Sequence, residues 1–437
     1  MTVSPGRYSY LAVLAAILIV LAIIGQMGGE IGESDSWPPK YLVNRIAVVT
    51  SDGGIRSYQP DGQSELSIST ESGYFTWPTW SPDGHRIVYS GVVENADGKP
   101  VTTLFLYEVT TRKSRRLHES APGFAGLLAE GVVHYPLWSP DGGRLAFIAA
   151  TQERGLTLFM DDPSSEEAPQ YVLDRGPLWM SWSSDSAKLA VHRDEDHFVV
   201  SAEDTARVFR TSFRSLAYRV PAWMPGLDEF NAVRGVAGPV FGLYSAPASG
   251  VGSERLLARV GVNAAFLWSA DGSRLAVADD VRPILYGNTV MFVYRQLRAL
   301  DSENLDAAVQ VNENIVAYFW SPDSSKIAYV TLVDPSGGLR WSVLDVASGV
   351  SSPLVDFLPS PDQLTMFQFF DQYSYSHQLW SPDSRYLVFA GILNEAAVTA
   401  GFGGQVGPTS RVFIMDTGPM RSALPMAEGT LGFWSPA

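Results

Sequence analysis

Six aspartates recur at one place in a repeated five-residue pattern, and carboxylates repeated in this way could serve as catalytic acids or as calcium ligands. Each stands three residues after a tryptophan: Asp83, Asp141, Asp185, Asp271, Asp323 and Asp383. The pattern is Trp-Ser-Pro-Asp-Gly at residues 80–84 and 138–142 and varies slightly elsewhere. Proline presets φ, serine and aspartate can bond nearby backbone N–H groups, and glycine accepts the exit geometry of a type I turn. We therefore interpret the aspartates as turn residues in separate parts of the fold.

The sequence excludes several other kinds of active site. Its 437 residues include no cysteine, which excludes disulfides, thiolate metal sites, iron–sulfur clusters and a cysteine nucleophile. The spacings of a G-x-S-x-G nucleophile elbow, an H-E-x-x-H zinc site, a P-loop and an EF-hand are also absent. The densest charged run, residues 192–197 (HRDEDH), could bind a cation, but we interpret it as a solvated loop between strands. We predict no catalytic residue, no metal and no cofactor.

A binding site is predicted from residues that lie just before the repeated tryptophans. Eight of them, aromatic or polar, are candidate ligand contacts: Trp77, His134, Tyr135, Trp179, Arg219, Tyr318, Tyr375 and His377. If the segments that carry them converge on one channel, their side chains meet at its mouth, where they could bind a peptide segment or a glycan. The alternative is that half or more of them only pack between neighbouring structural units.

Two long apolar insertions predict a second surface. Residues 122–133 (PGFAGLLAEGVV) form one, and residues 357–375 form the other, which carries the partner-contact candidates Phe367, Phe369, Phe370 and Tyr373. Apolar loops of this kind often mark contact with a partner or a bilayer, and folding back over the domain is the alternative. The glycine-rich residues 400–406 are typical of a hairpin tip rather than a phosphate cradle, because no helix start follows them.

The repeated tryptophans organise the chain. Eight of them occur at intervals of 41–60 residues, and we assign all eight a structural role: Trp80, Trp138, Trp182, Trp223, Trp268, Trp320, Trp380 and Trp434. A turn and three runs of alternating apolar residues follow each of the first seven, and each run is typical of a short strand. Four strands in about 40–60 residues is the pattern of one β-propeller blade.

The two ends of the sequence supply one further unit. Three strands without a preceding tryptophan are predicted at residues 45–49, 55–58 and 65–69, and one strand ending in tryptophan is predicted at residues 430–434. Together they make a set of four. The predicted fold class is therefore all-β: an eight-bladed β-propeller of four-stranded blades, with seven blades as the alternative. It is closed by pairing of the C-terminal strand with the three N-terminal strands.

The pattern W-S-P-D-G-x-x-[IL]-A-[FYV], seen at residues 138–147 and 320–329, resembles the repeats of the TolB family of periplasmic propellers. It is also similar to the propeller repeats of prolyl oligopeptidase and dipeptidyl peptidase. The resemblance covers residues 43–437 and implies the fold, whereas such propellers serve many functions. Dipeptidyl peptidases add a hydrolase domain, but here the sequence finishes on the closing strand and has no nucleophile elbow. Peptidase activity is therefore not carried over.

The N-terminal residues predict a membrane anchor. No charge lies between Arg7 and Glu30, and residues 11–24 are all apolar, so residues 8–27 approach the length of a membrane-spanning helix. Arg7 precedes the span and acidic residues follow it, which predicts residues 1–7 in the cytoplasm and the rest outside. Residues 28–42 would be a linker, and residues 43–437 the propeller. A cleaved signal peptide is the alternative.

These observations predict a membrane-anchored, extracytoplasmic propeller, periplasmic or at the cell surface. We expect it to bind or scaffold protein partners in a cell-envelope or membrane complex and to contact the lipid bilayer through its N-terminal helix. The formal net charge of −15 argues against nucleic acid as a partner. One alternative is a propeller enzyme of glycosidase, lyase or lactonase type with its site at the channel mouth, and the other is a ligand-sensing subunit.

Overall fold

A computed structural model describes residues 44–129, 131–215, 219–237, 240–286, 289–305, 307–333, 338–393, 409–418 and 421–436. The chain divides into two compact units, Met1–Tyr41 and Leu42–Ala437, and all the described elements belong to the second. Four stretches that carry predictions lie outside the described residues, and those predictions stay predictions. They are residues 1–7, 8–27, 28–42 and 400–406. None of the helices described is both long enough and apolar enough to span a bilayer.

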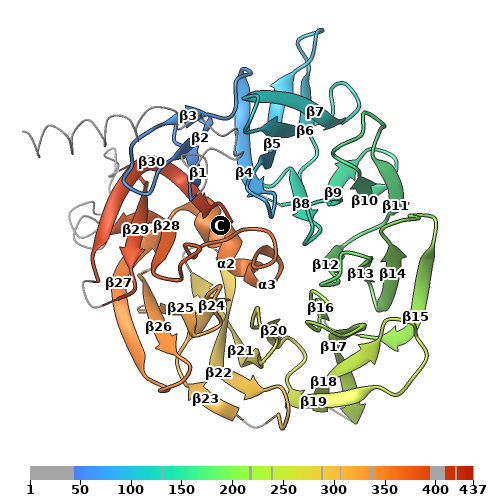
Figure 1. Ribbon diagram of the computed structural model, residues 1–437, viewed down its shortest axis with the longest axis vertical. Coiled ribbons are helices and arrows are strands. Elements are labelled where there is room, and N and C mark those ends of the chain that lie inside the picture. The colour runs from blue at the N-terminus through green and yellow to red at the C-terminus, as the bar shows by residue number, and fades with distance from the viewer. Residues whose placement is uncertain are drawn as a thin grey trace, which may run out of the picture. The chain divides into compact units, whose positions relative to one another are not determined.

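The second unit is built from antiparallel sheets that follow one another around a common centre (Figure 1). Four of these sheets have four strands each. In chain order their strands are β4 (Gly73–Trp80), β5 (Arg86–Glu94), β6 (Pro100–Glu108), β7 (Lys113–Glu119), β8 (His134–Trp138), β9 (Leu145–Thr151), β10 (Gly155–Asp161), β11 (Gln170–Leu173), β12 (Leu178–Trp182), β13 (Lys188–Arg193), β14 (Asp196–Ser201), β15 (Val208–Arg214), β16 (Ala222–Trp223), β17 (Glu229–Ala237), β18 (Val240–Pro247) and β19 (Arg255–Val260).

The other strands form one continuous hydrogen-bonded path that joins the C-terminal part of the unit to its N-terminal strands, except that β23 lies off this path and pairs with β22. They are β20 (Ala265–Trp268), β21 (Arg274–Tyr286), β22 (Thr289–Asp301), β23 (Ala307–Val311), β24 (Ile315–Trp320), β25 (Lys326–Leu332), β26 (Leu339–Asp345), β27 (Ser351–Pro359), β28 (Tyr386–Leu393), β29 (Arg411–Asp416), β30 (Ala423–Trp434), β1 (Ile46–Thr50), β2 (Ile55–Tyr58) and β3 (Leu66–Ser67). The link between β22 and β24 is a single pair, Tyr294 with Ile315.

The two ends of this unit are joined by strand pairing. The first part of β30 pairs with β29, and its last part pairs with β1, where Trp434 lies opposite Ile46. Beyond the pair, the backbone N–H of Arg45 donates to Ser435 Oγ at 2.8 Å, and the N–H of Ser435 donates to the Arg45 carbonyl at 2.7 Å. The predicted pairing of the C-terminal strand with the N-terminal three is present, so neither strand is left as an open edge.

The repeated turn is held by its own serine and aspartate. Ser81 Oγ donates to Asp83 Oδ1 at 2.5 Å and accepts from the N–H of Arg86 at 2.9 Å, while Asp83 Oδ1 accepts from the N–H of His85 at 2.9 Å. The equivalent bonds recur in the five other copies. The serine hydrogen bond lowers the pKa of Asp141 and of Asp185, so these carboxylates are charged turn acceptors.

The fifth residue of the turn adopts a left-handed conformation, which glycine reaches at little cost and serine only with strain. Gly84 has a φ of 72°, and Ser324 has a φ of 61° at the same place. Ser324 gains a compensating contact, because its Oγ accepts from the N–H of Asp271 in the preceding turn at 3.1 Å. Ser384 binds Asp323 in the same way. Where glycine is replaced, the turn is therefore bonded to its neighbour.

Apolar side chains fill the spaces between successive sheets. One buried cluster joins Val88 and Leu104 of the first sheet to Trp138 and Phe147 of the second. Each inner strand presents its tryptophan to the neighbouring sheet, which explains why a single tryptophan per unit recurs at a fixed place.

Two short helices interrupt the strand pattern, α2 (Pro361–Gln368) and α3 (Phe370–Tyr373). Ser360 caps α2 by accepting from the N–H of Gln363, and Pro361 occupies the first turn. Figure 1 shows both helices near the centre of the ring of sheets, and α3 contacts β20 and β24. The insertion at residues 357–375 thus lies across the centre.

Candidate functional site

The repeated tryptophans hydrogen-bond neighbouring inner strands to one another. In five of the eight, the indole N–H donates to a backbone carbonyl in the neighbouring sheet, at 3.0–3.3 Å. The acceptor is the residue that immediately precedes the repeated tryptophan of that sheet. The five bonds are Trp80 to Phe433, Trp138 to Thr79, Trp182 to Leu137, Trp320 to Leu267 and Trp380 to Phe319. Trp223 instead binds Leu227 of its own turn, and Trp268 binds the side chain of Asn231. The bonds of the first five tie their sheets to the preceding ones.

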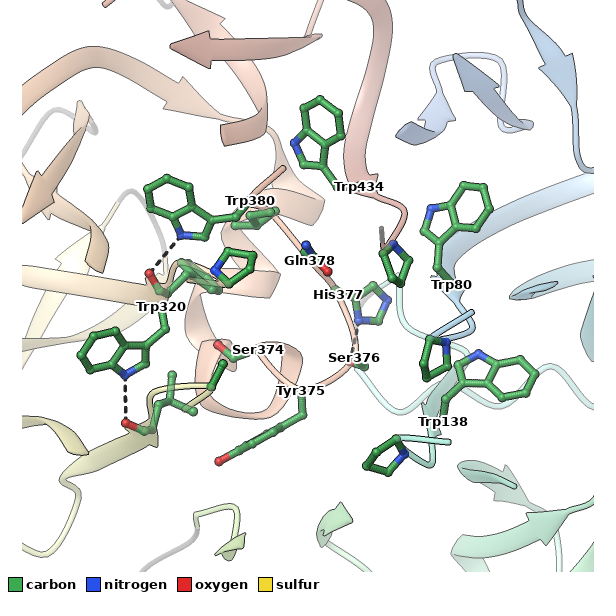
Figure 2. Close-up of a pocket in the computed structure, with 18 of the residues that line it drawn as sticks. Trp80, Trp138, Trp320, Ser374, Tyr375, Ser376, His377, Gln378, Trp380 and Trp434 are labelled. Atoms are coloured by element: carbon green, nitrogen blue, oxygen red, sulfur yellow. Dashed lines mark hydrogen bonds between the residues drawn. The ribbon is translucent and has the colours of Figure 1, made fainter. Parts of the chain in front are cut away.

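A cavity of about 560 Å³ lies inside this ring of tryptophans. All eight repeated tryptophans line it, together with five turn prolines and a short segment, residues 374–379. Figure 2 shows that segment passing through the middle of the cavity, with Trp80, Trp138, Trp320, Trp380 and Trp434 around it. None of the lining residues is Asp, Glu, Lys or Arg. We call this volume the tryptophan cavity.

Aromatic contacts fix the segment that forms the floor of the cavity. Tyr373 is buried and stacks on Trp77, with ring centroids 4.5 Å apart and planes 11° apart. Tyr135 contacts Tyr373 edge to face at 5.5 Å, and its hydroxyl donates to the carbonyl of Gln372 at 2.8 Å. Phe370, fully buried, packs on Tyr318 at 4.9 Å. The rings of three different inner strands, β4, β8 and β24, therefore hold α3 in place.

An ion pair adds a polar attachment on the other side of α3. Arg219 Nη1 lies 3.3 Å from Asp371 Oδ2, and its Nη2 donates to Tyr294 Oη at 2.6 Å and to the Asn263 carbonyl at 2.9 Å. The Arg219 side chain is 15 % exposed and that of Asp371 only 8 %. Buried charges of opposite sign need such partners, so the pair fixes the register of α3 against the sheets around it.

His377 is the histidine of the tryptophan cavity, and its surroundings keep it neutral. Its Nε2 lies 3.1 Å from Thr79 Oγ1, its Nδ1 lies 2.6 Å from Ser376 Oγ, and its ring meets Phe433 edge to face at 4.5 Å. Burial lowers the pKa of His377 to about 3. Both ring nitrogens have partners, so His377 is held in place and orders the cavity floor.

The structure brings most of the eight predicted ligand contacts to α3 and the segment after it. Trp77, Tyr135, Tyr318 and Arg219 contact residues 370–373, while Tyr375 and His377 themselves line the tryptophan cavity. The mouth at which they were predicted to bind a ligand holds α3. Their role as ligand contacts stays a prediction, and it applies most directly to Tyr375, which is 36 % exposed.

Of the other two predicted contacts, one packs against a neighbouring sheet and one packs within its own sheet. His134 is buried, with its Nδ1 3.2 Å from Ser90 Oγ, and Trp179 packs on His192 at 5.5 Å. Neither residue lines the tryptophan cavity. The contact of His134 is of the kind stated as the alternative for this set, which is packing between neighbouring units. The role of both residues as ligand contacts stays a prediction.

The four predicted partner contacts divide by exposure. Phe367 and Phe370 are fully buried and Tyr373 is 5 % exposed, whereas Phe369 is 40 % exposed. Residues 361–373 form α2 and α3, so this insertion follows the alternative of folding back over the domain. A partner contact at this segment stays a prediction, and Phe369 is the member of the set that a partner could reach.

Sequence reasoning missed the residues of the cavity wall and floor. Pro82 and Pro140 line the wall beside their tryptophans, and Ser374 and Gln378 belong to the floor. A signal for the wall was present, because six of the eight repeated tryptophans are followed two residues later by a proline. No local pattern marks the floor. The charged run at residues 192–197 was interpreted as a solvated loop. It is a hairpin whose terminal histidines, His192 and His197, are buried and stacked, with ring centroids 4.3 Å apart.

Comparison with solved structures finds the same kind of fold at low sequence identity. The structure of a eukaryotic initiation factor is 12 % identical, with a TM-score of 0.51, and the match covers 90 % of this chain and 99 % of that one. TolB from Acinetobacter baumannii is 17 % identical over 81 % of this chain and 83 % of its own, with a TM-score of 0.39. The β-propeller domain of the Trilobed protease from Pyrococcus furiosus is 15 % identical over 79 % and 94 %, with a TM-score of 0.46.

These similarities concern the fold alone. No family model matches the sequence, and the comparison with curated proteins found no match. The chain has an all-β fold of four-stranded antiparallel sheets whose structural neighbours include TolB and peptidase propellers, as the Trp-Ser-Pro-Asp-Gly repeat predicted.

Proposed function

We propose that this protein is a binding or scaffolding module of a cell-envelope or membrane complex. In this proposal it is an eight-bladed propeller, anchored by residues 8–27 and displayed outside the cytoplasm, in the periplasm or at the cell surface. Its tryptophan cavity receives an apolar side chain from a segment of a protein partner. A ligand-sensing subunit would use the same cavity for a small neutral molecule.

The blade count rests on the way the strands group. The four separate sheets, β20–β23 and β24–β27 give six sets of four strands. Trp380 bridges to Leu387 of β28, so that short inner segment, β28, β29 and the first part of β30 make a seventh. The end of β30 with β1, β2 and β3 makes the eighth.

The observation that carries the proposal is the lining of the tryptophan cavity. Aromatic rings and prolines form its wall, most indole N–H groups are already bonded to neighbouring strands, and no charged side chain enters it. Such a surface favours an uncharged, apolar group, which would gain about 25 cal/mol for each Å² removed from water. Polar atoms for orientation come from the floor, where Ser374, Ser376 and Gln378 lie.

The enzyme alternative needs groups that this lining does not provide. Glycosidases use a pair of carboxylates, and lyases or lactonases use a base or a metal held by side chains. Among the lining residues the titratable side chains are His377, whose pKa is lowered to about 3 by burial, and Tyr375. We therefore favour binding over catalysis at this site.

The test is capture of partners by the full-length protein, extracted from its native membrane in mild detergent, with bound proteins and small ligands identified by mass spectrometry. Two matched variants locate the interface. Tyr375→Ala changes an exposed aromatic residue of the cavity, and Phe369→Ala changes an equally exposed aromatic residue outside it. Loss of a reproducible envelope protein in the first variant but not in the second supports the cavity.

Loss of the envelope protein in Phe369→Ala but not in Tyr375→Ala would instead place the interface on the exposed side of the insertion. Capture that neither variant affects contradicts binding in the tryptophan cavity. Recovery of a small neutral ligand without any protein replaces the scaffold with the ligand-sensing alternative.

A further inference from the structure

A small pocket lies between the neighbouring sheets β8–β11 and β12–β15 (Figure 1). Its volume is about 140 Å³, and most of its lining comes from the end of β10 and from the β10–β11 and β14–β15 connections. β10 ends at Asp161 opposite Leu145, which also pairs with Trp138. β14 likewise ends beside the first residue of β13, directly after the next tryptophan turn. The pocket therefore lies at the ends of both sheets that carry the tryptophan turns. We call it the acidic pocket.

Acidic side chains outnumber basic ones in this lining. The carboxylates are those of Asp161, Asp162, Glu167 and Glu203. Arg144 is the only basic residue among the lining residues, all of which belong to the described part of the chain. Its Nη1 donates to Asp162 Oδ2 at 2.5 Å, and its Nε donates to the Ala202 carbonyl at 3.2 Å. Within the described residues no ion pair is found for the other three carboxylates.

Asp161 is the most buried of the four acidic residues. It is 4 % exposed, and its Oδ2 is shielded from solvent without a hydrogen-bond partner among the residues that the structure describes. Arg115 lies nearby, but its Nη2 donates to the carbonyls of Pro163 and Ser165, at 2.7 and 3.3 Å. Burial raises the pKa of Asp161 to about 6, while the charge of Arg115 acts to lower it. At neutral pH this carboxylate is therefore mostly charged and lacks the partner that a buried charge needs.

A cation would supply that partner, and the lining favours an ammonium group over a metal ion. Within the described part of the chain, no three His, Asp or Glu side chains are grouped so that they could hold a metal. A primary ammonium group is a compact charge with three N–H donors, so it can bind acceptors that lie on separate sides of it. An interior cavity of about 150 Å³ accommodates benzene. The acidic pocket can therefore hold an ammonium group together with several carbons of its chain.

A larger hollow of about 820 Å³ borders the acidic pocket and gives such a chain a way out. The two share four lining residues, which are Arg144, Asp162, Ala202 and Glu203. Four serines line the larger hollow, and its other two cations are paired. Lys188 Nζ lies 2.7 Å from Asp228 Oδ2. Arg207 Nε lies 3.1 Å from Asp204 Oδ2. An extended, polar chain thus fits beside the pocket.

We propose that the acidic pocket binds a primary ammonium group at the end of a flexible chain, with Asp161 as its principal charged partner and Glu203 as the exposed second one. The ammonium group belongs either to a free diamine or to a lysine side chain of a protein partner, since the chemistry of recognition is the same. The acidic pocket and the tryptophan cavity share no lining residue, so this site does not rest on the proposed function.

Isothermal titration calorimetry of the full-length protein with cadaverine tests the site. Asp161→Asn keeps the shape of the side chain and removes its charge. We expect it to weaken binding at pH 7 about tenfold or more, because a hydrogen bond to a charged group is lost. The matched control is Asp97→Asn, which removes the charge of an exposed aspartate in the β5–β6 connection and should leave the affinity unchanged.

A second variant and a pH change keep the test decisive if Asp161→Asn folds poorly, which circular dichroism checks. Glu203 is exposed, so Glu203→Gln should fold normally and weaken binding about twofold. Lowering the pH from 7 to 5 protonates Asp161 and should weaken binding to the unaltered protein, while binding to Asp161→Asn should change little.

A second probe separates the two sources of the ammonium group. A short peptide that contains one lysine is titrated beside cadaverine: tighter binding of the peptide supports a protein partner, and tighter binding of cadaverine supports a free amine. The proposal is overturned if neither probe binds at millimolar concentration, or if folded Asp161→Asn binds both as tightly as the unaltered protein does. Calcium binding that Asp161→Asn abolishes, without binding of either amine, would identify a metal site and also overturn it.

Discussion

Replacing Tyr373 by alanine should detach the floor of the tryptophan cavity from the sheets around it. Tyr373 is 5 % exposed, stacks on Trp77 at 4.5 Å and meets His377 at 5.2 Å and Tyr135 at 5.5 Å. It ends α3, so its ring is the last attachment before residues 374–379 enter the cavity. The matched variant is Tyr373→Phe, which keeps the ring and removes the hydroxyl.

The expected magnitude follows from the ring rather than from the hydroxyl. Truncating a buried aromatic side chain to alanine costs about 3–5 kcal/mol of the free energy of unfolding, and each lost aromatic pair contributes about 0.5–1.5 kcal/mol of that total. We expect Tyr373→Ala to lower the free energy of unfolding by about 4 kcal/mol. No hydrogen bond of the Tyr373 hydroxyl is found among the described residues, so Tyr373→Phe should cost less than about 1 kcal/mol.

Two measurements check this expectation. Urea unfolding followed by tryptophan fluorescence gives the change in stability, and amide hydrogen exchange of residues 370–378 shows where it acts. Faster exchange in that segment, with unchanged protection of β8 and β24, is expected for the alanine variant. The reasoning is refuted if the two variants unfold within about 1 kcal/mol of each other, because the stacked ring would then not hold the floor.

Three further predictions concern the sheets themselves. Trp138→Phe should lower the free energy of unfolding by about 1–2 kcal/mol in urea titrations, because the indole N–H that donates to the Thr79 carbonyl at 3.3 Å is lost, and an unchanged midpoint would contradict this. Ser324→Ala should be less stable than Ser324→Gly by about 1 kcal/mol. Both variants lose the bond to Asp271, but only glycine adopts the φ of 61° without strain, and equal stabilities would be inconsistent with this account. Burial lowers the pKa of His134 to about 3, so the folded state disfavours its protonation. Stability should therefore fall as the pH drops from about 6.5 towards 3, by up to about 1.4 kcal/mol for each pH unit, and His134→Phe should flatten that slope in urea titrations between pH 7 and pH 4.

The parts of the fold that could be predicted are those that local chemistry determines. The turn needs only residues within five positions of one another, as Ser81, Asp83 and Arg86 illustrate, so each copy can be recognised by itself. The strand at residues 55–58 was predicted with its observed bounds, and the strand predicted at residues 45–49 is displaced by one residue. All-β architecture and closure by the C-terminal strand followed from counting these local units.

The floor of the candidate site could not be predicted, because its contacts are distant in sequence. Tyr135 and Gln372 are 237 positions apart, and Arg219 and Asp371 are 152 positions apart. An aromatic-rich insertion is equally compatible with an exposed surface and with a buried plug, and only the packing in three dimensions decides between them. For the same reason the local pattern of short strands gave no sign that β21 extends to Tyr286.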